Sequence, residues 1–335
     1  MRMRWALIGA SRIARQYMVG AIRAQHGEIL QVLSASAERA RAFADEHHIP
    51  RSGTDLNELL QNPDVDAVYI STTNEKHVPQ AIAALTAGKH VLCEKPLALT
   101  LKEASDMVCA ADEAGLVFAT NHHLRCSGSH RAVRALIASG RIGRVLSLRL
   151  HHAVFLPPHL QGWRINSPGA GGGVIPDITV HDADVARFHL GEDPVSVVAQ
   201  MASSGLGEGV EDSAMSVWTM ASGAMVMSHE SFTHPFAGSG LEVHGTDGSI
   251  FARDVMTQNP IGSIELVTAS GREAIGFDQH DLYAEGVRRF HAAVAGDGEP
   301  AATGLDGVKS LAVALAVRDA AARGVRVEVN YGDLH

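Results

Sequence analysis

Two short segments place acidic, basic and imidazole side chains at spacings that suit proton transfer. They are Glu94-Lys95-Pro96 and the stretch from Asp177 to His181. Asp177 and His181 are four residues apart, so on a helix both would lie on one face, where His181 could protonate an alkoxide while Asp177 orients the imidazole or binds substrate hydroxyls. Lys95 could polarise a carbonyl and stabilise the negative charge that develops on its oxygen. These residues suit the reduction of a ketone, and whether Lys95 or His181 gives the proton is open at this point.

A third segment stands where a dinucleotide could bind. Gly9-Ala10-Ser11-Arg12-Ile13-Ala14 lies between a short apolar run and a helical stretch, in the place of the fingerprint G-x-G-x-x-G/A. Ser11 replaces the second glycine, which normally lets the backbone approach the pyrophosphate. The interpretation therefore depends on the strand-turn-helix context. The alternative is a tight turn that binds no ligand.

The end of the next apolar run indicates which nicotinamide cofactor is used. An NAD site usually carries an acidic residue here, whereas this chain has Ser34-Ala35-Ser36, with Arg39 one turn further on. Serine hydroxyls and a guanidinium could bind a 2′-phosphate, so we expect NADPH to be favoured over NADH. The alternative makes Arg39 a solvated helix residue among Glu38 and Arg41.

The N-terminal part of the chain alternates strands with helices, which predicts a parallel, doubly wound sheet. We expect five strands, at 5–8, 29–33, 66–70, 90–93 and 117–120. Helices are expected at 13–24, 37–47, 55–60, 78–87 and 101–114. The predicted fold is a Rossmann dinucleotide-binding domain covering residues 1–121.

The remaining chain, 122–335, has strand patterns without intervening helices, which predicts an α+β domain with a largely antiparallel, open sheet. Strands are expected within 143–155 and at 196–202, 214–220, 224–231, 241–244 and 263–268, and helices at 180–189, 283–295 and 307–322. We expect Asp182 and Asp184 to cap or solvate the first of these helices. This domain would bind the substrate, and its open sheet offers a dimerisation face, which leaves a homodimer and a monomer both open.

Glu94-Lys95-Pro96 followed by the D-x-x-x-H pattern of Asp177 and His181 resembles the glucose-fructose oxidoreductase and inositol dehydrogenase family over essentially the whole chain. The segments 71–77, 121–125, 156–164 and 243–246, with the Gly-Ala-Ser-x-Ile-Ala turn, look closest to bacterial members that reduce 1,5-anhydro-D-fructose. The resemblance also implies cofactor contacts beyond the residues of the turn and beyond Ser34, Ala35 and Arg39. These further contacts are Ser71, Thr72, Thr73, Asn74, His77, Glu94, Lys95, Asn121, Trp163, Arg164 and Tyr283. Candidate substrate contacts are Lys95, His159, Arg164, Asp177 and His181. Trp163 and Arg164 could form a lid, or Trp163 could simply be packed.

The expected reaction is the NADPH-dependent reduction of 1,5-anhydro-D-fructose to 1,5-anhydro-D-mannitol, or of a closely similar keto-sugar. One alternative is the NAD-linked oxidation of a cyclic polyol or sugar. A second is a glycosidase of the same fold that holds NAD tightly, and a third is a cofactor-sensing regulator that catalyses nothing. The proton-transfer set of Lys95, Asp177 and His181 argues against the regulator.

Composition limits the remaining classes. The chain has 335 residues, of which 46% are hydrophobic and 19% charged, as expected for a globular protein of two domains. A net charge of −9 argues against a nucleic-acid partner. The three cysteines show no C-x-x-C spacing, and no metal site is expected. The first apolar run is too short for a signal peptide and no stretch would span a membrane, so a cytoplasmic protein is expected.

Overall fold

The computed structural model describes residues 2–332, which form two compact units. The first unit comprises Met1–His123 and Tyr283–Val308, and the second comprises Leu124–Leu282 and Lys309–His335. None of the helices between residues 2 and 332 combines the length and the apolar character needed to cross a bilayer.

A six-stranded parallel sheet forms the centre of the first unit, in the order β3-β2-β1-β4-β5-β6. Its strands are β1 (Arg4–Ile8), β2 (Glu28–Leu33), β3 (Arg51–Gly53), β4 (Ala67–Ile70), β5 (His90–Cys93) and β6 (Phe118–Thr120). Strands β1 and β4 consist almost wholly of buried residues, as continuous apolar runs in a parallel sheet should. The order reverses between β1 and β4, which makes the edge after these strands the topological switch point.

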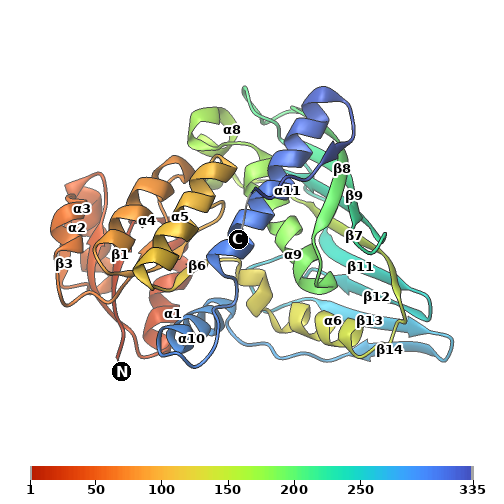
Figure 1. Ribbon diagram of the computed structural model, residues 1–335, viewed down its shortest axis with the longest axis horizontal. Helices are drawn as coiled ribbons and strands as arrows, with labels where there is room; N and C mark the ends of the chain where they lie inside the picture. The colour runs from red at the N-terminus through yellow and green to blue at the C-terminus, as the bar shows by residue number, and fades with distance from the viewer. Residues whose placement is uncertain (1, 333–335) are drawn as a thin grey trace. The chain divides into compact units, whose positions relative to one another are not determined.

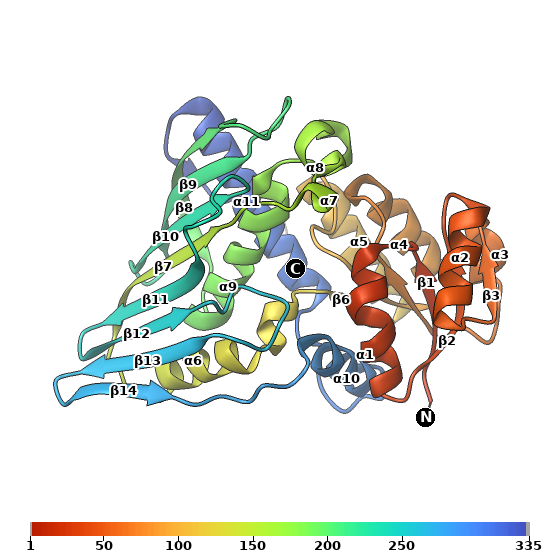
Figure 2. The ribbon, with the colours of Figure 1, turned by 180° about the vertical axis from the view of Figure 1, so that it is seen from behind.

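Helices cover both faces of this sheet: α4 and α5 lie along one face in Figure 1, and Figure 2 shows α1 on the other. The elements are η1 (Ala14–Met18, a π-helical turn), α1 (Val19–Ala24), α2 (Ala37–His47), α3 (Leu56–Leu60), η2 (Asn74–Lys76), α4 (His77–Thr86), α5 (Leu101–Ala114) and α10 (Leu282–Val294). Right-handed crossovers in both directions from β1 and β4 account for helices on opposite faces.

The second unit contains a nine-stranded sheet in the order β14-β13-β12-β11-β7-β10-β9-β8-β15. Its strands are β7 (Val145–Ala153), β8 (Pro194–Ala202), β9 (Ser213–Met220), β10 (Met225–Ser231), β11 (Ser239–Gly245), β12 (Gly248–Arg253), β13 (Ser263–Thr268), β14 (Gly271–Ile275) and β15 (Val327–Glu328). Neighbouring strands run antiparallel except β7 and β10, which are parallel. The expected fold class, a Rossmann domain followed by a domain with a largely antiparallel sheet, is confirmed.

The helical elements of the second unit include α6 and α9, which lie over one face of its sheet (Figure 1). They are η3 (His123–Cys126), α6 (Gly128–Ala138), α7 (Pro158–Gln161), α8 (Trp163–Asn166), η4 (Pro168–Ala170), η5 (Ile175–Thr179, π-helical), α9 (Val180–Leu190) and α11 (Gly304–Arg323). The division between the two units falls within three helical elements: after His123 in η3, after Leu282 in α10 and after Val308 in α11.

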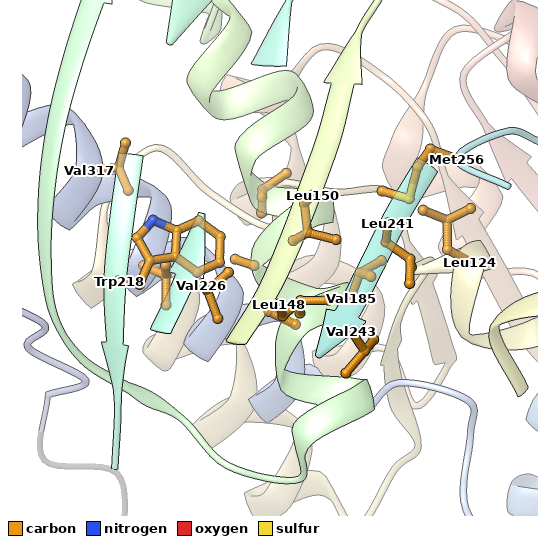
Figure 3. Packing of buried hydrophobic residues seen from close by; sticks show 14 of the residues in the cluster. Leu124, Leu148, Leu150, Val185, Trp218, Val226, Leu241, Val243, Met256 and Val317 are labelled. Atoms are coloured by element: carbon orange, nitrogen blue, oxygen red, sulfur yellow. The ribbon is translucent and has the colours of Figure 1, made fainter. Parts of the chain in front are cut away.

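An apolar core lies between this sheet and helices α9 and α11. Figure 3 shows Leu148 and Leu150 of β7 beside Leu241 of β11, with Val185 of α9 packed against them. Alternate residues of each strand point into this core, because the side-chain period of a strand is two. The intervening residues expose apolar side chains instead, and Met215 and Met225 are the most exposed of these on β9 and β10.

Most expected elements lie within a few residues of their predicted positions. Strand β3 was missed, so the expected count of five parallel strands was wrong; this strand has three residues and its burial is low. Strands β12 and β14 and helix α6 were also missed. β12 and β14 begin with a glycine and α6 follows a short turn, which made these segments look like loops.

Candidate active site

Five candidate cofactor residues directly follow parallel strands of the first unit. They are Gly9 after β1, Ser34 after β2, Ser71 after β4, Glu94 after β5 and Asn121 after β6. Parallel strands end at one edge of their sheet, so these residues share the edge that carries the switch point. Ligands of doubly wound sheets bind at this edge.

The turn after β1 packs closely against the turn after β4. A Cβ at Gly9 would lie 3.0 Å from the carbonyl carbon and oxygen of Ser71, and Gly9 has φ +119°, so only glycine fits here. Ser11 donates to or accepts from the hydroxyl of Ser71 at 2.7 Å and accepts from the backbone N–H of Ala14 at 3.1 Å. Ser11 therefore accepts a hydrogen bond from the first turn of the helix that starts here and ties the two turns together.

Ser34 and Arg39 lie side by side at the end of β2. The Nε–H of Arg39 donates to Oγ of Ser34 at 3.1 Å, and Ser36 caps α2 by accepting from the backbone N–H of Arg39 at 3.3 Å. Ser34 is buried, whereas Ala35, Ser36 and Arg39 are exposed. The result is an exposed guanidinium hydrogen-bonded to a buried hydroxyl, without a carboxylate in the strand-end segment 34–36.

Glu94 is held inside the first unit by two donors. The hydroxyl of Tyr69 donates to Oε1 of Glu94 at 2.5 Å, and Nδ2 of Asn121 donates to the same oxygen at 2.6 Å. Burial raises the pKa of Glu94 above its usual value, against the effect of these hydrogen bonds and of Lys95. Lys95 follows directly, half-buried, with a cis peptide bond to Pro96. The fixed Glu94 thus sets the start of the loop that carries Lys95.

His77 joins two loops of this edge through its ring. Nδ1 lies 2.8 Å from the carbonyl oxygen of Pro96, and Nε2 lies 3.2 Å from that of Thr72. Burial lowers the pKa of His77, so the ring is neutral near pH 7 and donates one N–H, which we assign to the shorter contact with Pro96. His77 therefore braces the loop after Lys95. Nearby, Thr72 donates to Oε1 of Gln80 and Thr73 to Oε1 of Glu75, while Asn74 is buried.

Tyr283 is buried in a stack of three rings within the first unit. Its ring centroid lies 4.7 Å from that of Tyr17 and 5.2 Å from that of His123, with interplanar angles of 15° and 12°. Neither Tyr17 nor His123 was expected from the sequence, because nothing in the pattern marks residues so far apart as neighbours.

Asp177 and His181 belong to one continuous helical segment of the second unit. Asp177 lies on the π-helical turn η5, His181 on the first turn of α9, and both are buried. The Nε–H of Arg164 donates to Oδ2 of Asp177 at 3.2 Å, and the guanidinium carbon of Arg164 lies 4.6 Å from the centre of the Trp163 ring. The structure thus brings together Asp177, Arg164 and Trp163, while His159 lies exposed on α7.

The glycine run before this helix allows the segment carrying Arg164 to approach. The N–H of Gly173 donates to the carbonyl of Arg164 at 2.8 Å, and a Cβ at Gly172 would lie 2.6 Å from the carbonyl oxygen of Trp163. Glu211 accepts from the N–H of Ile175 at 3.1 Å and so satisfies an amide at the start of the helix. Glycine is needed at position 172 because its backbone lies directly against the backbone of the segment that carries Trp163 and Arg164.

The expectation that Asp182 and Asp184 cap or solvate the helix was wrong. Both side chains are fully buried, with exposed fractions of 0% and 1%. Asp184 accepts from Arg125 at 2.7 Å, and Asp182 lies 3.1 Å from Nδ1 of His152 on β7. Helix α9 is buried on most sides, so residues that look like a solvated face in the sequence point into the unit.

Among residues 2–332, no group of three or more histidine, cysteine, aspartate or glutamate side chains is arranged to hold a metal ion.

A Rossmann unit with polar side chains at its switch-point edge, next in sequence to a unit built on a largely antiparallel sheet, defines a two-domain nicotinamide-dependent oxidoreductase. Residues 3–122 match the model of an oxidoreductase family with an NAD-binding Rossmann fold, and residues 130–251 match the GFO/IDH/MocA C-terminal domain. The chain belongs to the GFO/IDH/MocA family of oxidoreductases.

Individual relatives agree with this assignment. The chain is 55% identical to 1,5-anhydro-D-fructose reductase from Ensifer adhaerens, over 98% of this chain and 99% of that one. A solved aldose-aldose oxidoreductase from Caulobacter crescentus has a TM-score of 0.90 and 25% identity, and covers 98% of this chain and 100% of its own. Levoglucosan dehydrogenase in complex with NADH and levoglucosan, with a TM-score of 0.89 and 24% identity over 98% and 100% of the two chains, has the same fold.

Proposed function

We propose that this chain reduces 1,5-anhydro-D-fructose to 1,5-anhydro-D-mannitol with NADPH. The observation that carries the proposal is the 55% identity, over almost the full length of both chains, to a reductase of that substrate. The polar character of Arg164, Asp177 and His181 supports a sugar, because a hydroxyl-rich substrate needs buried hydrogen-bond partners.

The chemistry proposed for the chain's residues follows from their types. NADPH, when bound, supplies the hydride that converts the carbonyl carbon into a carbinol carbon. The ammonium of Lys95 donates a hydrogen bond to the carbonyl oxygen, which polarises the bond and stabilises negative charge on the oxygen. His181 gives its proton to that oxygen, because an imidazole exchanges protons most readily near neutral pH.

Asp177 and Arg164 bind and orient in this proposal. The Asp177 carboxylate holds either the imidazole of His181 or a hydroxyl of the sugar, and Arg164 fixes the carboxylate through the 3.2 Å hydrogen bond. Trp163 stacks under Arg164 and limits its movement, which supports a lid formed by these two side chains.

The donor set at the end of β2 fits NADPH. A 2′-phosphate would find the Ser34 hydroxyl and the Arg39 guanidinium already adjacent, at 3.1 Å, and would meet no carboxylate in the segment 34–36. Ser71 to Asn74, Glu94 and Asn121 line the loops at the same edge and would hold the nicotinamide half. A cytoplasmic location, where NADPH is available, remains a prediction of the sequence.

The sequence leaves a homodimer and a monomer open, and the second unit favours the dimer. The outer face of its sheet exposes Met215 and Val217 on β9 and Met225 and Met227 on β10, between 42% and 57% each. Sedimentation velocity of the purified chain separates the two states directly.

The test of the function is the rate of reduced-nicotinamide loss with 1,5-anhydro-D-fructose, measured in parallel with NADPH and NADH. Consumption equal to the substrate converted, a preference for NADPH and 1,5-anhydro-D-mannitol as the product are expected. Turnover with no net cofactor loss would instead indicate the glycosidase chemistry. Cofactor binding without reduction of this sugar would contradict the proposed substrate.

A further inference from the structure

The apolar inner face of the second sheet is interrupted by a cluster of polar side chains. These are His152 on β7, Ser228 and Glu230 on β10, and Asp182 on α9. Asp182, Ser228 and Glu230 have exposed fractions of 0%, and His152 of 9%. Glu230 is paired in register with His152 on the neighbouring strand, so both side chains lie on the same face. Burying two acidic groups in an apolar core is costly unless each finds partners.

Hydrogen bonds connect the four side chains into a chain. Nδ1 of His152 lies 3.1 Å from Oδ1 of Asp182, and the Ser228 hydroxyl lies 3.2 Å from Oδ2 of Asp182 and 2.5 Å from Oε1 of Glu230. Burial, followed by repulsion from Asp182, raises the pKa of Glu230 well above its usual range. The buried surroundings therefore favour the protonated form of Glu230, while Oδ1 of Asp182 faces His152.

The cluster reaches His181 through His152. Asp182 follows His181 in the chain, so the two side chains leave the helix in different directions. The ring centroids of His152 and His181 are 6.5 Å apart. At that separation one bridging water can link two ring nitrogens. The side chain of His152 is 11% exposed, whereas that of Asp182 is fully buried, so His152 is the member of the pair that meets water.

We propose that His152, held by Asp182, returns a proton to His181 after each turnover. The inference rests on the proposed function, in which His181 gives its proton to the substrate oxygen. Asp182 accepts the Nδ1–H of His152 and stabilises its imidazolium form. The Nε2–H bond of His152 then breaks as its proton passes to the bridging water, and that water gives one of its own protons to a ring nitrogen of His181. A proton from solvent then restores the Nε2–H of His152. His152 and Asp182 are positioning residues, since neither side chain touches the reacting atoms of the substrate.

Other titratable groups surround this pair on every packed element. They are His130 from α6, His151 from β7, His229 and Glu230 from β10, and His181 from α9. Burial lowers the pKa of His130 to about 4, and burial also lowers the pKa of His151 and of His229. These three rings are neutral near pH 7, so they place no positive charge beside His152 and Asp182.

The test separates the first turnover from later ones. In stopped-flow reduction, the variant His152→Asn is expected to consume one equivalent of NADPH rapidly and then to turn over about tenfold or more slowly. The variant Asp182→Asn should move the basic limb of the kcat profile to lower pH by about one unit, with little change in KM, because an imidazole loses an anionic neighbour. Wild-type steady-state kcat in His152→Asn, without a burst, would overturn the proposal.

Controls distinguish this role from a structural one. His244 and Glu242 form another histidine–carboxylate pair, at 3.4 Å on β11, and His244→Asn should keep the wild-type kcat and pH profile. If Asp182→Asn fails to fold, His152→Asn and His152→Gln still decide the outcome. Full activity of His181→Asn would refute the proposed proton donor. An inactive His181→Asn together with a burst-free, fully active His152→Asn would refute this inference alone.

Discussion

The cofactor edge of the first unit and the surroundings of His181 in the second unit are built in different ways. At the cofactor edge, each candidate residue directly follows its own strand, and the topology of a parallel sheet gathers them. Around His181, the neighbours come from β7, β10 and the segment before α9, and they meet through strand register and side-chain packing.

The difference shows which kind of site can be recognised from local patterns. A residue at the end of a buried parallel strand reaches the ligand edge whatever its neighbours do. A residue on a sheet face reaches the core only if the register is right, because a shift by one residue turns it to the other face. A substitution at the cofactor edge should therefore change one property of the protein, such as cofactor choice. A substitution around His181 should change several properties together, because the side chains there contact one another.

The largest effect on kcat is expected for the two side chains proposed to act on the substrate oxygen. Lys95→Met and His181→Asn should each lower kcat about 100- to 10,000-fold, because each removes a group that acts on the substrate oxygen. NADPH binding, followed by fluorescence titration, should stay within a few-fold of the wild type. A variant that retains the wild-type rate would remove that residue from the mechanism.

The next largest effect is expected at the end of β2, and it tests whether this strand end by itself sets the preference for NADPH over NADH. Arg39→Ala should raise the KM for NADPH about 10- to 100-fold, the value of a lost hydrogen bond to a charged group, and should leave the KM for NADH unchanged. Arg41→Ala, an exposed arginine on the same helix, is the matched control and should change neither. Equal effects on both cofactors would place the role of Arg39 outside the 2′-phosphate.

A smaller effect is expected where the turns after β1 and β4 touch. Gly9→Ala should destabilise the protein by about 1–3 kcal/mol, because φ is +119° and the added Cβ would meet Ser71 at 3.0 Å. Gly20→Ala provides the control: it lies on α1 with nothing within 4 Å of its added Cβ, and should be neutral or slightly stabilising. Thermal unfolding measures both, and equal melting temperatures would show that the turns can separate without cost.

An effect of the same size at pH 7, which decreases at lower pH, is expected for a carboxylate that stabilises a loop of the second unit. Asp212 accepts from the backbone N–H groups of Ser204, Gly205, Leu206 and Gly207, and these hydrogen bonds outweigh burial and lower its pKa to about 2. A lowered pKa gives stability that is present above about pH 4 and is lost as the pH falls toward 2. Asp212→Asn should therefore cost about 1–3 kcal/mol at pH 7 and progressively less below pH 4.

Unfolding of the wild type and Asp212→Asn in denaturant, across this pH range, tests the prediction. A difference between them that does not depend on pH would mean that the charge of Asp212 is not what holds the loop.

The long elements were predicted well because their patterns are strong. Helices α2 and α5 and strands β5 and β13 have the predicted bounds, since caps or turn residues mark their ends. The edge strand β3 and strand β14 are weak patterns with little burial, which explains their absence from the prediction. Tyr69 was missed as a partner of Glu94 because a buried tyrosine in a strand looks like any core residue.

By itself, the sequence determined the two-part architecture, the switch-point turn at Gly9, the strand-end position of Lys95 and the four-residue spacing of Asp177 and His181. These features depend on local periodicity and on residues that terminate strands or begin helices, which act over a few positions. Only the tertiary structure decided that Asp182 is buried against His152, that Glu230 lies beside them and that Arg164 holds Asp177. Those contacts join segments 13 to 78 residues apart, and their formation depends on strand register and on the packing of α9 against the sheet.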